Sequence, residues 1–436
     1  MLKVSRSSGS RRFVLPVILL LLLSLLSAAC DSVEDEKLPV ADYGKDGSQF
    51  ARRFARTYPG RGPGSDQEHA AGDFIIKTLK EMGYAPVVTT FTLPVEPMED
   101  QEPESAADDT DITVQKAPSS RNIAVFVEGK GFTRTGVDGQ QTRFRKQVII
   151  GAHYDTPVSI EEIEAAAAET KATESEKPSG GSGPSLAEYT GIQDNASGVA
   201  ALMTIARELK NYDLGYDVVL VAFGAGSADQ AGSRFFAGQL SRAEIAATDA
   251  MYCIDSIYAG DKVYAHSGRN SILGGDRKDY EKRRKLYEAT DVFFENLLYS
   301  NNRYMLYTNQ SSFLMELEGY AEPVVYREWS LNDSDYLPFD ELGIPIVFFE
   351  SYDYDEKSVA EMKESHNPAF GATNGRIRGT GFDSTDFLEQ LLNSTRSSAA
   401  RVTDRPLDDQ LTRRINNTAF IILEALAKGN HDADAR

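Results

Sequence analysis

The segment VAFGAGSADQAGSRFF, residues 221–236, begins like a buried strand, turns through small residues and ends like the start of a helix. Strand-to-helix turns are where open α/β proteins place ligand-binding and catalytic groups. Here the turn reads Gly226–Ser227, and neither side chain is titratable near neutral pH. The segment predicts an α/β fold and leaves open what chemistry its turn supports.

Strands and helices alternate along the rest of the chain. Apolar and β-branched runs without a helical period predict buried strands at 122–129, 145–155, 216–224, 250–257 and 344–351. Helical spacing of apolar residues lies between them, at 70–82, 199–210, 280–299 and 411–428, with Ser65 as a cap and Gly83 as a stop for the first helix. This alternation predicts a layered α/β domain around a largely parallel sheet.

The balance of charge argues against some partners. The chain has 46 Lys and Arg against 66 Asp and Glu, a formal net charge of -20. A protein that neutralises phosphates needs a surplus of cations, so we expect no nucleic-acid partner.

The amino terminus resembles a bacterial lipoprotein signal peptide. Basic residues at 3, 6, 11 and 12 precede the apolar run FVLPVILLLLLSLL and the sequence SAAC, which ends at Cys30. The apolar run has the length of a signal-peptide core and is short for a membrane span. We expect 1–30 to be the signal, Cys30 to be acylated, and the mature protein to be anchored to the membrane of the cell envelope. Secretion without a lipid is the alternative.

The remaining segments define the expected domain boundaries. Residues 31–48 are expected to form a polar tether, 49–429 the folded domain, and 430–436 a disordered tail. Two stretches at about 93–121 and 158–188 contain too few apolar residues to offset chain entropy, so they predict mobile surface insertions.

Three motifs with metal-binding residue types lie at predicted strand ends or helix starts. His153 and Asp155 end one strand in GAHYDTP, Asp194 precedes a helix in GIQDNASG, and Asp255 ends another strand in YCIDSI. An imidazole can bind a metal while a nearby carboxylate orients its other nitrogen. Each residue alone is more often structural, but three at one expected edge indicate a site, because buried carboxylates need a cation or hydrogen-bond donors.

With these motifs in this order, the chain resembles the co-catalytic zinc exopeptidases of peptidase family M28, which include bacterial secreted aminopeptidases and glutaminyl cyclases. GRGPGSDQEHAAGDF, RNIAVFVEG, GAHYDTP, DNASGVAAL and SDYLPFDELGIPIVFFE carry the resemblance, from about residue 50 to the carboxyl terminus. It implies a single three-layer α/β domain with a mixed sheet, and a peptide or protein amino terminus as ligand. His153, Asp194 and Asp255 match the ligands of one zinc ion, and Asp155 matches the carboxylate that supports His153.

The residues of the second zinc site depart from the family pattern. Aligning Ala231–Arg234 without gaps puts Gly226 at the general-base Glu and Ser227 at a ligand Glu. A ligand His becomes Gly379, although Thr380 and Asp383 of that motif match. Another His that commonly follows the Ser-Asp pair is Tyr336.

These departures predict at most one zinc ion, or none, and a weakly active or inactive protein. Loss of a general base alone costs about 10²- to 10⁴-fold in rate. One alternative is an active metallo-aminopeptidase in which His366 or Asp229 supplies a replacement ligand. The other is a non-catalytic peptide-binding or scaffold lipoprotein, so the sequence leaves catalytic competence open.

Overall fold

The computed structural model describes residues 40–94, 117–173, 183–268, 277–308, 313–315, 324–326, 332–356, 359–394 and 407–433. The expected signal, Cys30 and residues 31–39 of the expected tether lie outside these ranges. None of the helices within them is both long enough and apolar enough to span a bilayer. The unit described below is Tyr43–Arg436.

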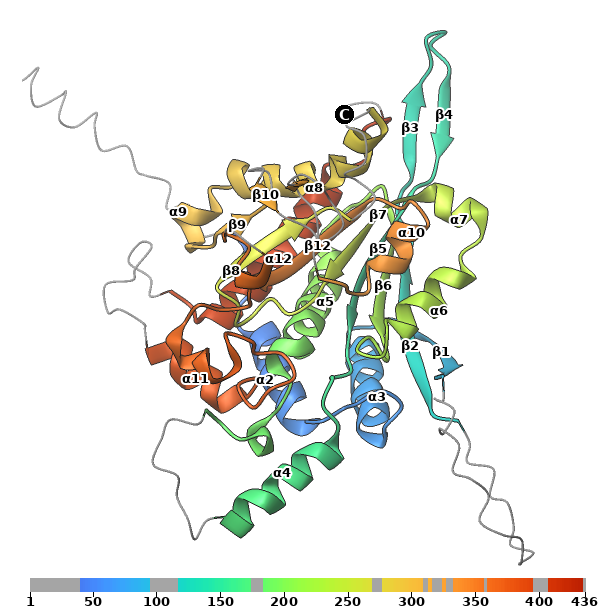
Figure 1. Cartoon of the computed structure of the whole chain (residues 1–436). Helices are drawn as coiled ribbons and strands as arrows, with labels where there is room; N and C mark the ends of the chain where they lie inside the picture. Colours follow the sequence, from blue (N-terminus) through green and yellow to red (C-terminus); the bar gives the residue numbers. More distant parts are fainter. Residues whose placement is uncertain are drawn as a thin grey trace, which may run out of the picture. The chain divides into compact units, whose positions relative to one another are not determined.

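An eight-stranded sheet forms the centre of this unit, in the order β1-β2-β6-β5-β7-β12-β8-β9 (Figure 1). Its strands are β1 Val87–Thr92, β2 Ser119–Val127, β5 Gln147–His153, β6 Asp217–Phe223, β7 Thr248–Ile254, β8 Lys262–His266, β9 Leu306–Tyr307 and β12 Ile346–Tyr352. Neighbours from β6 to β12 run parallel, as do β8 and β9. The pairs β1–β2, β2–β6 and β12–β8 run antiparallel. The predicted mixed sheet with a parallel centre is confirmed.

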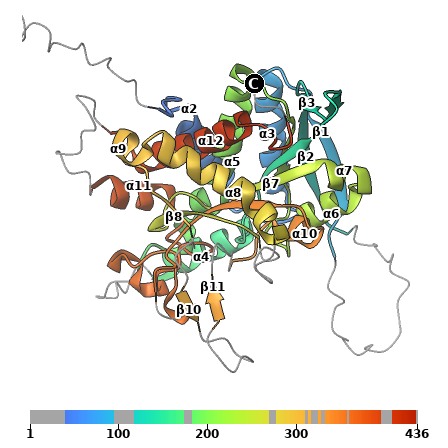
Figure 2. The same ribbon diagram turned by 90° about the horizontal axis from the view of Figure 1, so that it is seen from above.

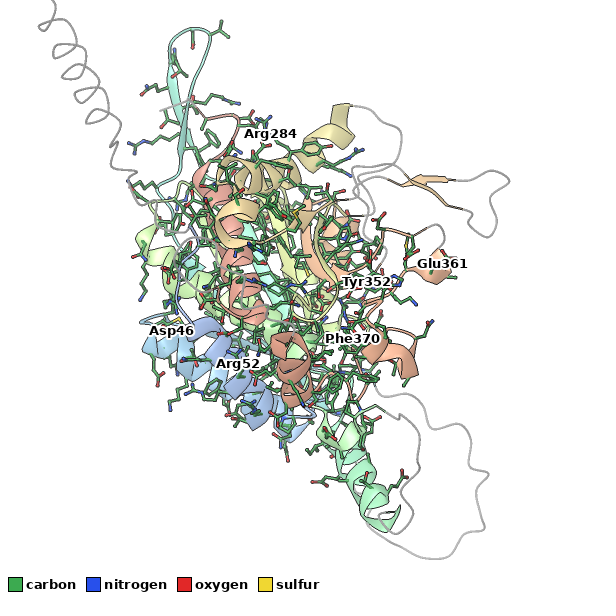
Figure 3. The ribbon with its side chains drawn as sticks, turned by 90° about the vertical axis from the view of Figure 1, so that its left-hand side faces the viewer. Asp46, Arg52, Arg284, Tyr352, Glu361 and Phe370 are labelled. Carbon is green, nitrogen blue, oxygen red and sulfur yellow. The ribbon has the colours of Figure 1, made fainter. Side chains whose placement is uncertain are left out.

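Helices cover both faces of the sheet (Figures 1 and 2). Helices α5 Ser197–Glu208, α8 Arg277–Glu295 and α12 Gln410–Ala427 pack on one face, with α2 Asp46–Thr57 against α5 and α12. On the other face, α6 Ala231–Gln239, α7 Arg242–Ala247 and α10 Leu337–Glu341 bury an apolar cluster against the central strands. Arg52 on α2 (Figure 3) lies 3.1 Å from Asp409, the cap of α12, and so joins two helices of one layer.

The predicted helices and strands occur close to their expected positions. Helix α3, Asp66–Glu81, begins where the sequence indicates, because the Ser65 side chain accepts a hydrogen bond of 3.1 Å from the backbone N–H of Glu68. Gly83 follows the helix with a φ of 85°, a left-handed conformation that glycine adopts without strain. Capping chemistry and apolar periodicity together therefore determine these boundaries.

Other segments differ from the expectation or were not anticipated. Part of the second expected insertion is helical, as α4 Ile160–Thr173, since its Ala- and Glu-rich sequence has high helix propensity. The expected tail begins with a buried Asn430 that donates a hydrogen bond to Asp249. Two small hairpins, β3 Phe132–Thr135 with β4 Gln141–Phe144 and β10 Phe313–Met315 with β11 Val324–Tyr326, were not predicted. Helices α9 Leu298–Asn302 and α11 Thr385–Ser394 complete the set that the structure describes.

Gly151 on the central strand β5 provides a test of the packing. A Cβ atom at this position would lie 2.3 Å from a ring carbon of Phe223 and 3.0 Å from the Met251 methyl group. We expect Gly151→Ala to lower the free energy of unfolding by about 1–3 kcal/mol through overpacking, measured by urea denaturation. Gly238 in α6 is the matched control, because a Cβ there meets nothing within 4 Å, and Gly238→Ala should stabilise the helix by up to about 1 kcal/mol. Equal effects at both positions would contradict this packing.

Candidate metal centre

The structure brings His153, Asp194 and Asp255 together. His153 ends β5 and Asp255 follows the neighbouring parallel strand β7, so both emerge at one edge of the sheet, and Asp194 precedes α5. His153 Nε2 lies 3.3 Å from Asp194 Oδ1 and 3.4 Å from Asp255 Oδ1. The three side chains are buried, with exposed fractions of 5%, 7% and 4%. This convergence is what the strand-end positions predict.

The donor set fits one zinc ion. One ligand atom from each of the three residues lies within 4.8 Å of the others, and imidazole nitrogen and carboxylate oxygen are the ligand types that zinc takes in catalytic sites. Asp194 Oδ1 has no hydrogen-bond partner although it is buried. A buried carboxylate oxygen without a donor is available to coordinate a cation. In the part of the chain that the structure describes, no second group of His, Cys, Asp and Glu side chains meets the same test.

Asp155 connects the candidate ligands to the turn at 226–227. Its carboxylate accepts hydrogen bonds from the backbone N–H of Gly226 at 2.6 Å, the N–H of Ser227 at 2.9 Å and the Ser227 hydroxyl at 2.5 Å. It also lies 3.3 Å from His153 Nδ1. Burial opposes the charge of Asp155, but His153 and these donors outweigh it and lower the pKa of the carboxyl. Asp155 thus remains ionised beside His153, as its expected supporting role requires.

The turn leaves no room for a side chain at 226. A Cβ atom on Gly226 would lie 2.4 Å from the Cβ of His153. Buried Glu68 holds the preceding residue, because it accepts hydrogen bonds from the N–H of Ala225 at 2.8 Å and from the Ser120 hydroxyl at 2.6 Å. Burial and repulsion from Asp155 raise the pKa of Glu68 to about 7. The sequence analysis did not identify Glu68; its position three residues after Ser65 was the available signal.

Gly379 and Tyr336, which stand where the family pattern has histidines, are each held in a conformation or contact of their own. Gly379 has a φ of 64°, a left-handed conformation that is costly for a histidine. Tyr336 is fully buried, and its hydroxyl donates to the carbonyl of Asn332 at 2.9 Å. Asp383, which matches the family motif, accepts hydrogen bonds from the backbone N–H groups of Gln193 and Asp194 at 2.7 and 3.0 Å. The segment that contains Asp383 therefore positions the backbone of Asp194.

Neither of the two proposed replacement ligands joins the three-residue group. His366 is about one-third exposed, and its Nε2 lies 3.1 Å from Glu356 Oε1. Asp229 has a side chain that is 86% exposed and lies 3.6 Å from Arg234. Neither residue lines the pocket that contains His153.

A pocket of about 610 Å³ opens on the candidate ligands. Tyr352, the last residue of β12, lines the pocket together with residues of the segment that follows it, among them Met362 and Glu364. Figure 3 labels Tyr352 and, in that following segment, Phe370. Asp335 also lines the pocket; it is 1% exposed, and neither of its carboxyl oxygens has a hydrogen-bond partner. Burial raises the pKa of Asp335 to about 7. The sequence analysis noted its Ser-Asp motif but missed this buried carboxyl.

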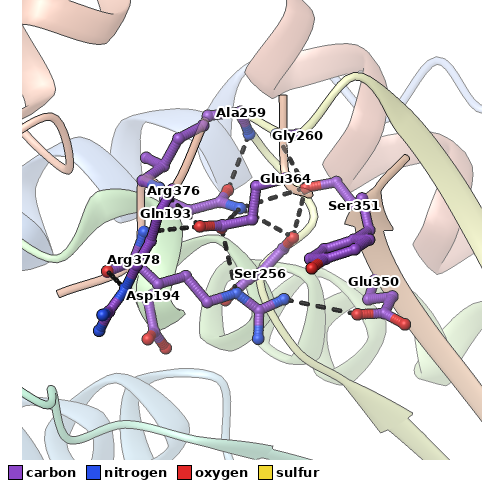
Figure 4. A network of polar contacts seen from close by, with 12 residues as sticks. Gln193, Asp194, Ser256, Ala259, Gly260, Glu350, Ser351, Glu364, Arg376 and Arg378 are labelled. Carbon is purple, nitrogen blue, oxygen red and sulfur yellow. Dashed lines mark hydrogen bonds and ion pairs between the residues drawn. The ribbon is translucent and has the colours of Figure 1, made fainter. Parts of the chain in front are cut away.

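A network of polar contacts around Gln193 lies next to the candidate ligand Asp194 (Figure 4). The Gln193 side chain accepts hydrogen bonds from the N–H groups of Tyr258 and Ala259 at 3.0 and 2.7 Å, and donates to Glu364 at 3.3 Å. Because Gln193 is adjacent to Asp194, the network also restrains that candidate ligand.

The electrostatics of the group favour bound cations. Burial alone would lower the pKa of His153, but Asp255, Asp155 and Asp194 outweigh it and hold that pKa well above the ordinary value. Burial likewise opposes ionisation of Asp255, whereas Arg378 and His153 lower its pKa. The site is therefore rich in negative charge, and positive groups within it are stabilised.

Comparisons with known proteins agree on one family and one fold. A family model described as Peptidase family M28 matches residues 136–369. The alkaline phosphatase isozyme conversion protein of Escherichia coli (strain K12) is 26% identical over 220 residues, 50% of this chain and 52% of that protein. This chain thus spans about half the length of the curated relative that it matches.

Two solved structures show the same architecture. A zinc aminopeptidase from Bacillus subtilis has a TM-score of 0.50 at 13% identity, covering 89% of this chain and 97% of its own. A glutaminyl cyclase from Porphyromonas gingivalis has a TM-score of 0.51 at 17% identity, covering 90% of this chain and 100% of its own. Both identities are low, so these likenesses concern the fold.

The contacts of Asp155 predict its effect on zinc binding. Asp155→Asn replaces one acceptor oxygen by a donor that faces N–H groups of the turn, and it removes the negative charge beside His153. We expect zinc affinity to fall about 10- to 100-fold, as for other changes of groups that orient a metal ligand. Competition with a chromophoric zinc chelator measures this. Ser227→Ala, which keeps both backbone donors to Asp155, is the matched control and should cause a smaller loss; unchanged affinity in Asp155→Asn would contradict the supporting role.

Proposed function

The chain belongs to peptidase family M28, and from this membership we propose that it is an envelope-anchored aminopeptidase-like protein with weak or absent peptidase turnover. It binds at most one zinc ion, at His153, Asp194 and Asp255. One observation carries the proposal: the turn at Gly226–Ser227 lacks both family carboxylates and has no space for a side chain at 226.

The retained residues support ligand binding better than turnover. A zinc ion bound to the three-ligand group supplies Lewis-acid polarisation of a carbonyl oxygen. Asp155 supports His153, and Asp383 holds the backbone N–H of Asp194. Asp255 accepts hydrogen bonds from the hydroxyls of Ser256 and Ser334 at 2.7 and 2.8 Å. Ser227 in turn directs its hydroxyl to Asp155, so neither it nor Gly379 provides a ligand for a second ion.

A missing proton acceptor is the main chemical deficit. A hydrolase of this type needs a general base next to the attacking water, and its loss costs about 10²- to 10⁴-fold. By alignment, Gly226 stands where the family has its general-base Glu. The backbone N–H of Gly226 donates a hydrogen bond to the Asp155 carboxylate. The protein retains a pocket with the acidic residues Asp194, Asp255, Asp333 and Asp335. Negative charge of this kind favours the ammonium group of a peptide or protein amino terminus.

Zinc stoichiometry and turnover test the proposal together. After dialysis of the purified protein against zinc, we expect about one zinc ion or fewer per chain, lost in Asp194→Ala, because the part of the chain that the structure describes forms a single adequate donor set. Release of amino acids from short peptides should be slow or undetectable. About two zinc ions, with chelator-sensitive turnover abolished in Asp194→Ala, would instead establish an active aminopeptidase. Undiminished partner binding by His153→Ala and by chelated protein would favour the scaffold alternative.

Restoring the missing carboxylate provides a second arm of that experiment. Gly226→Glu is expected not to gain turnover, because its Cβ would collide with His153. Gly226→Ala separates the effect of the Cβ from that of the carboxylate, and both variants should lose stability. A gain of peptidase activity in Gly226→Glu alone would show that the turn can accommodate the base.

Anchoring is the part of the proposal that depends on sequence. The signal-like segment and Cys30 support export and acylation, which would place the protein on a membrane of the bacterial cell envelope. Mass spectrometry of the native amino terminus tests this, with an acylated Cys30 as the expected first residue. An unmodified terminus at another position would indicate secretion without a lipid.

A further inference from the structure

Arg378, the residue before Gly379, directs its guanidinium into the acidic centre of the pocket wall (Figure 4). Its nitrogens lie 3.6 Å from Asp255 Oδ2, 3.6 Å from Glu350 Oε2 and 3.2 Å from Glu364 Oε1. The Arg378 side chain is 19% exposed. One cation therefore lies among three carboxylates, one of which belongs to the candidate metal ligands.

The three carboxylates are buried and need positive charge nearby. Asp255, Glu350 and Glu364 have exposed fractions of 4%, 0% and 4%. Glu350 receives hydrogen bonds from Asn332 and Tyr354, and Glu364 from backbone N–H groups. Neutral donors reduce the cost of burying a carboxylate, but a cation within this distance contributes more in a region of low dielectric.

Asp255 is shared between Arg378 and the three-ligand group. Its Oδ1 faces His153 Nε2 at 3.4 Å, and its Oδ2 faces Arg378 at 3.6 Å. Any cation held by His153, Asp194 and Asp255 therefore lies in the repulsive field of the guanidinium. The position of the guanidinium thus favours the negative charge of these carboxylates and disfavours a second cation beside Asp255.

The contacts between Arg378 and the three carboxylates do not form a complete set of hydrogen bonds. Arg378 Nε and Nη2 have no partner with hydrogen-bond geometry, so the contacts act mainly through charge. Arg376 provides a contrast on the same wall: it is exposed, and its Nε donates to the backbone carbonyl of Arg378 at 3.0 Å. Both arginines line the pocket, and Arg378 forms ion pairs with buried acids of its wall.

We propose that Arg378 is the second cation of this site: its guanidinium replaces the charge of a second metal ion and weakens zinc binding by His153, Asp194 and Asp255. This inference rests on the proposed single zinc site. It explains how a chain without the second site's ligands keeps a cluster of buried carboxylates stable.

Zinc affinity of charge-changing variants tests the inference. The full-length protein is freed of metal with a chelator, and Zn²⁺ is then titrated in competition with a chromophoric chelator. Arg378→Met and Arg378→Gln remove the charge, Arg378→Lys keeps it, and Arg376→Met is the matched control. We expect both neutral variants to bind zinc about tenfold more tightly or better, because the repulsion is gone. Arg378→Lys and Arg376→Met should remain within about threefold of the wild-type affinity.

Thermal unfolding with and without zinc provides the second readout. The wild-type protein should unfold at nearly the same temperature after chelation, whereas Arg378→Met should be destabilised without zinc and recover when zinc is added. If both neutral variants fold only in the presence of zinc, the inference is supported, since the metal then replaces the lost charge. If they remain unfolded with zinc, or bind it no more tightly than wild type, the inference is overturned.

The two proposals fail in different ways. The zinc-to-protein ratio of the wild type tests the single zinc site, whereas the ratio of affinities between Arg378→Met and wild type tests Arg378. A wild type that binds two zinc ions would contradict the proposed function and also Arg378 as a replacement cation. If the wild type binds no measurable zinc and Arg378→Met binds one ion, the result supports the inference that Arg378 strongly weakens zinc binding.

Discussion

The hydrogen bonds from the turn at 226–227 to the carboxylate of Asp155 are the constraint on which the site depends. Three donors of Gly226 and Ser227 converge on this carboxylate, which also lies beside His153. These hydrogen bonds hold the turn in contact with His153. A Cβ atom at position 226 would collide with that histidine, so only glycine fits there. The same contact orients His153, a candidate metal ligand, and excludes a side chain at position 226.

Buried charge is the second theme of this molecule. Arg61 is fully buried and donates to the backbone carbonyls of Tyr154, Thr190 and Gly191 at 2.6, 3.0 and 2.8 Å. It thereby fixes the loops that follow His153 and precede Asp194. Arg378 performs a different task, since its ion pairs are with carboxylates. A chain with a net charge of -20 thus places two of its cations beside buried carbonyl and carboxylate oxygens.

The strands and the meeting of the three candidate ligands could be predicted because both follow from local sequence patterns. Continuous apolar runs identify β5 and β7, and parallel neighbours must end at one edge, so His153 and Asp255 had to be close. The short hairpins were missed because their strands are only three or four residues long, which leaves little periodicity to detect. Helix α4 was missed because the segment has few large apolar residues, which predicts a mobile insertion, although its Ala and Glu residues have high helix propensity.

Nothing in the sequence distinguishes Asp335 and Arg378, since charged side chains are usually solvated. For Glu68, the spacing from Ser65 indicates a role at the helix start, but it does not indicate that the side chain is buried against other segments. Only their burial distinguishes them, and burial depends on segments far away in the chain. Ala225 and Ser120, for example, are the partners of Glu68.

By itself the sequence determined the family, the α/β architecture and the absence of carboxylates at 226 and 227, because residue identity and spacing carry that information directly. The tertiary structure alone decided that the turn closes on His153 and that Arg378 lies among Asp255, Glu350 and Glu364. The physical reason is range. Periodicity and capping act within a few residues, whereas the charge around a buried site is set by side chains from strands and loops that meet only when the sheet forms.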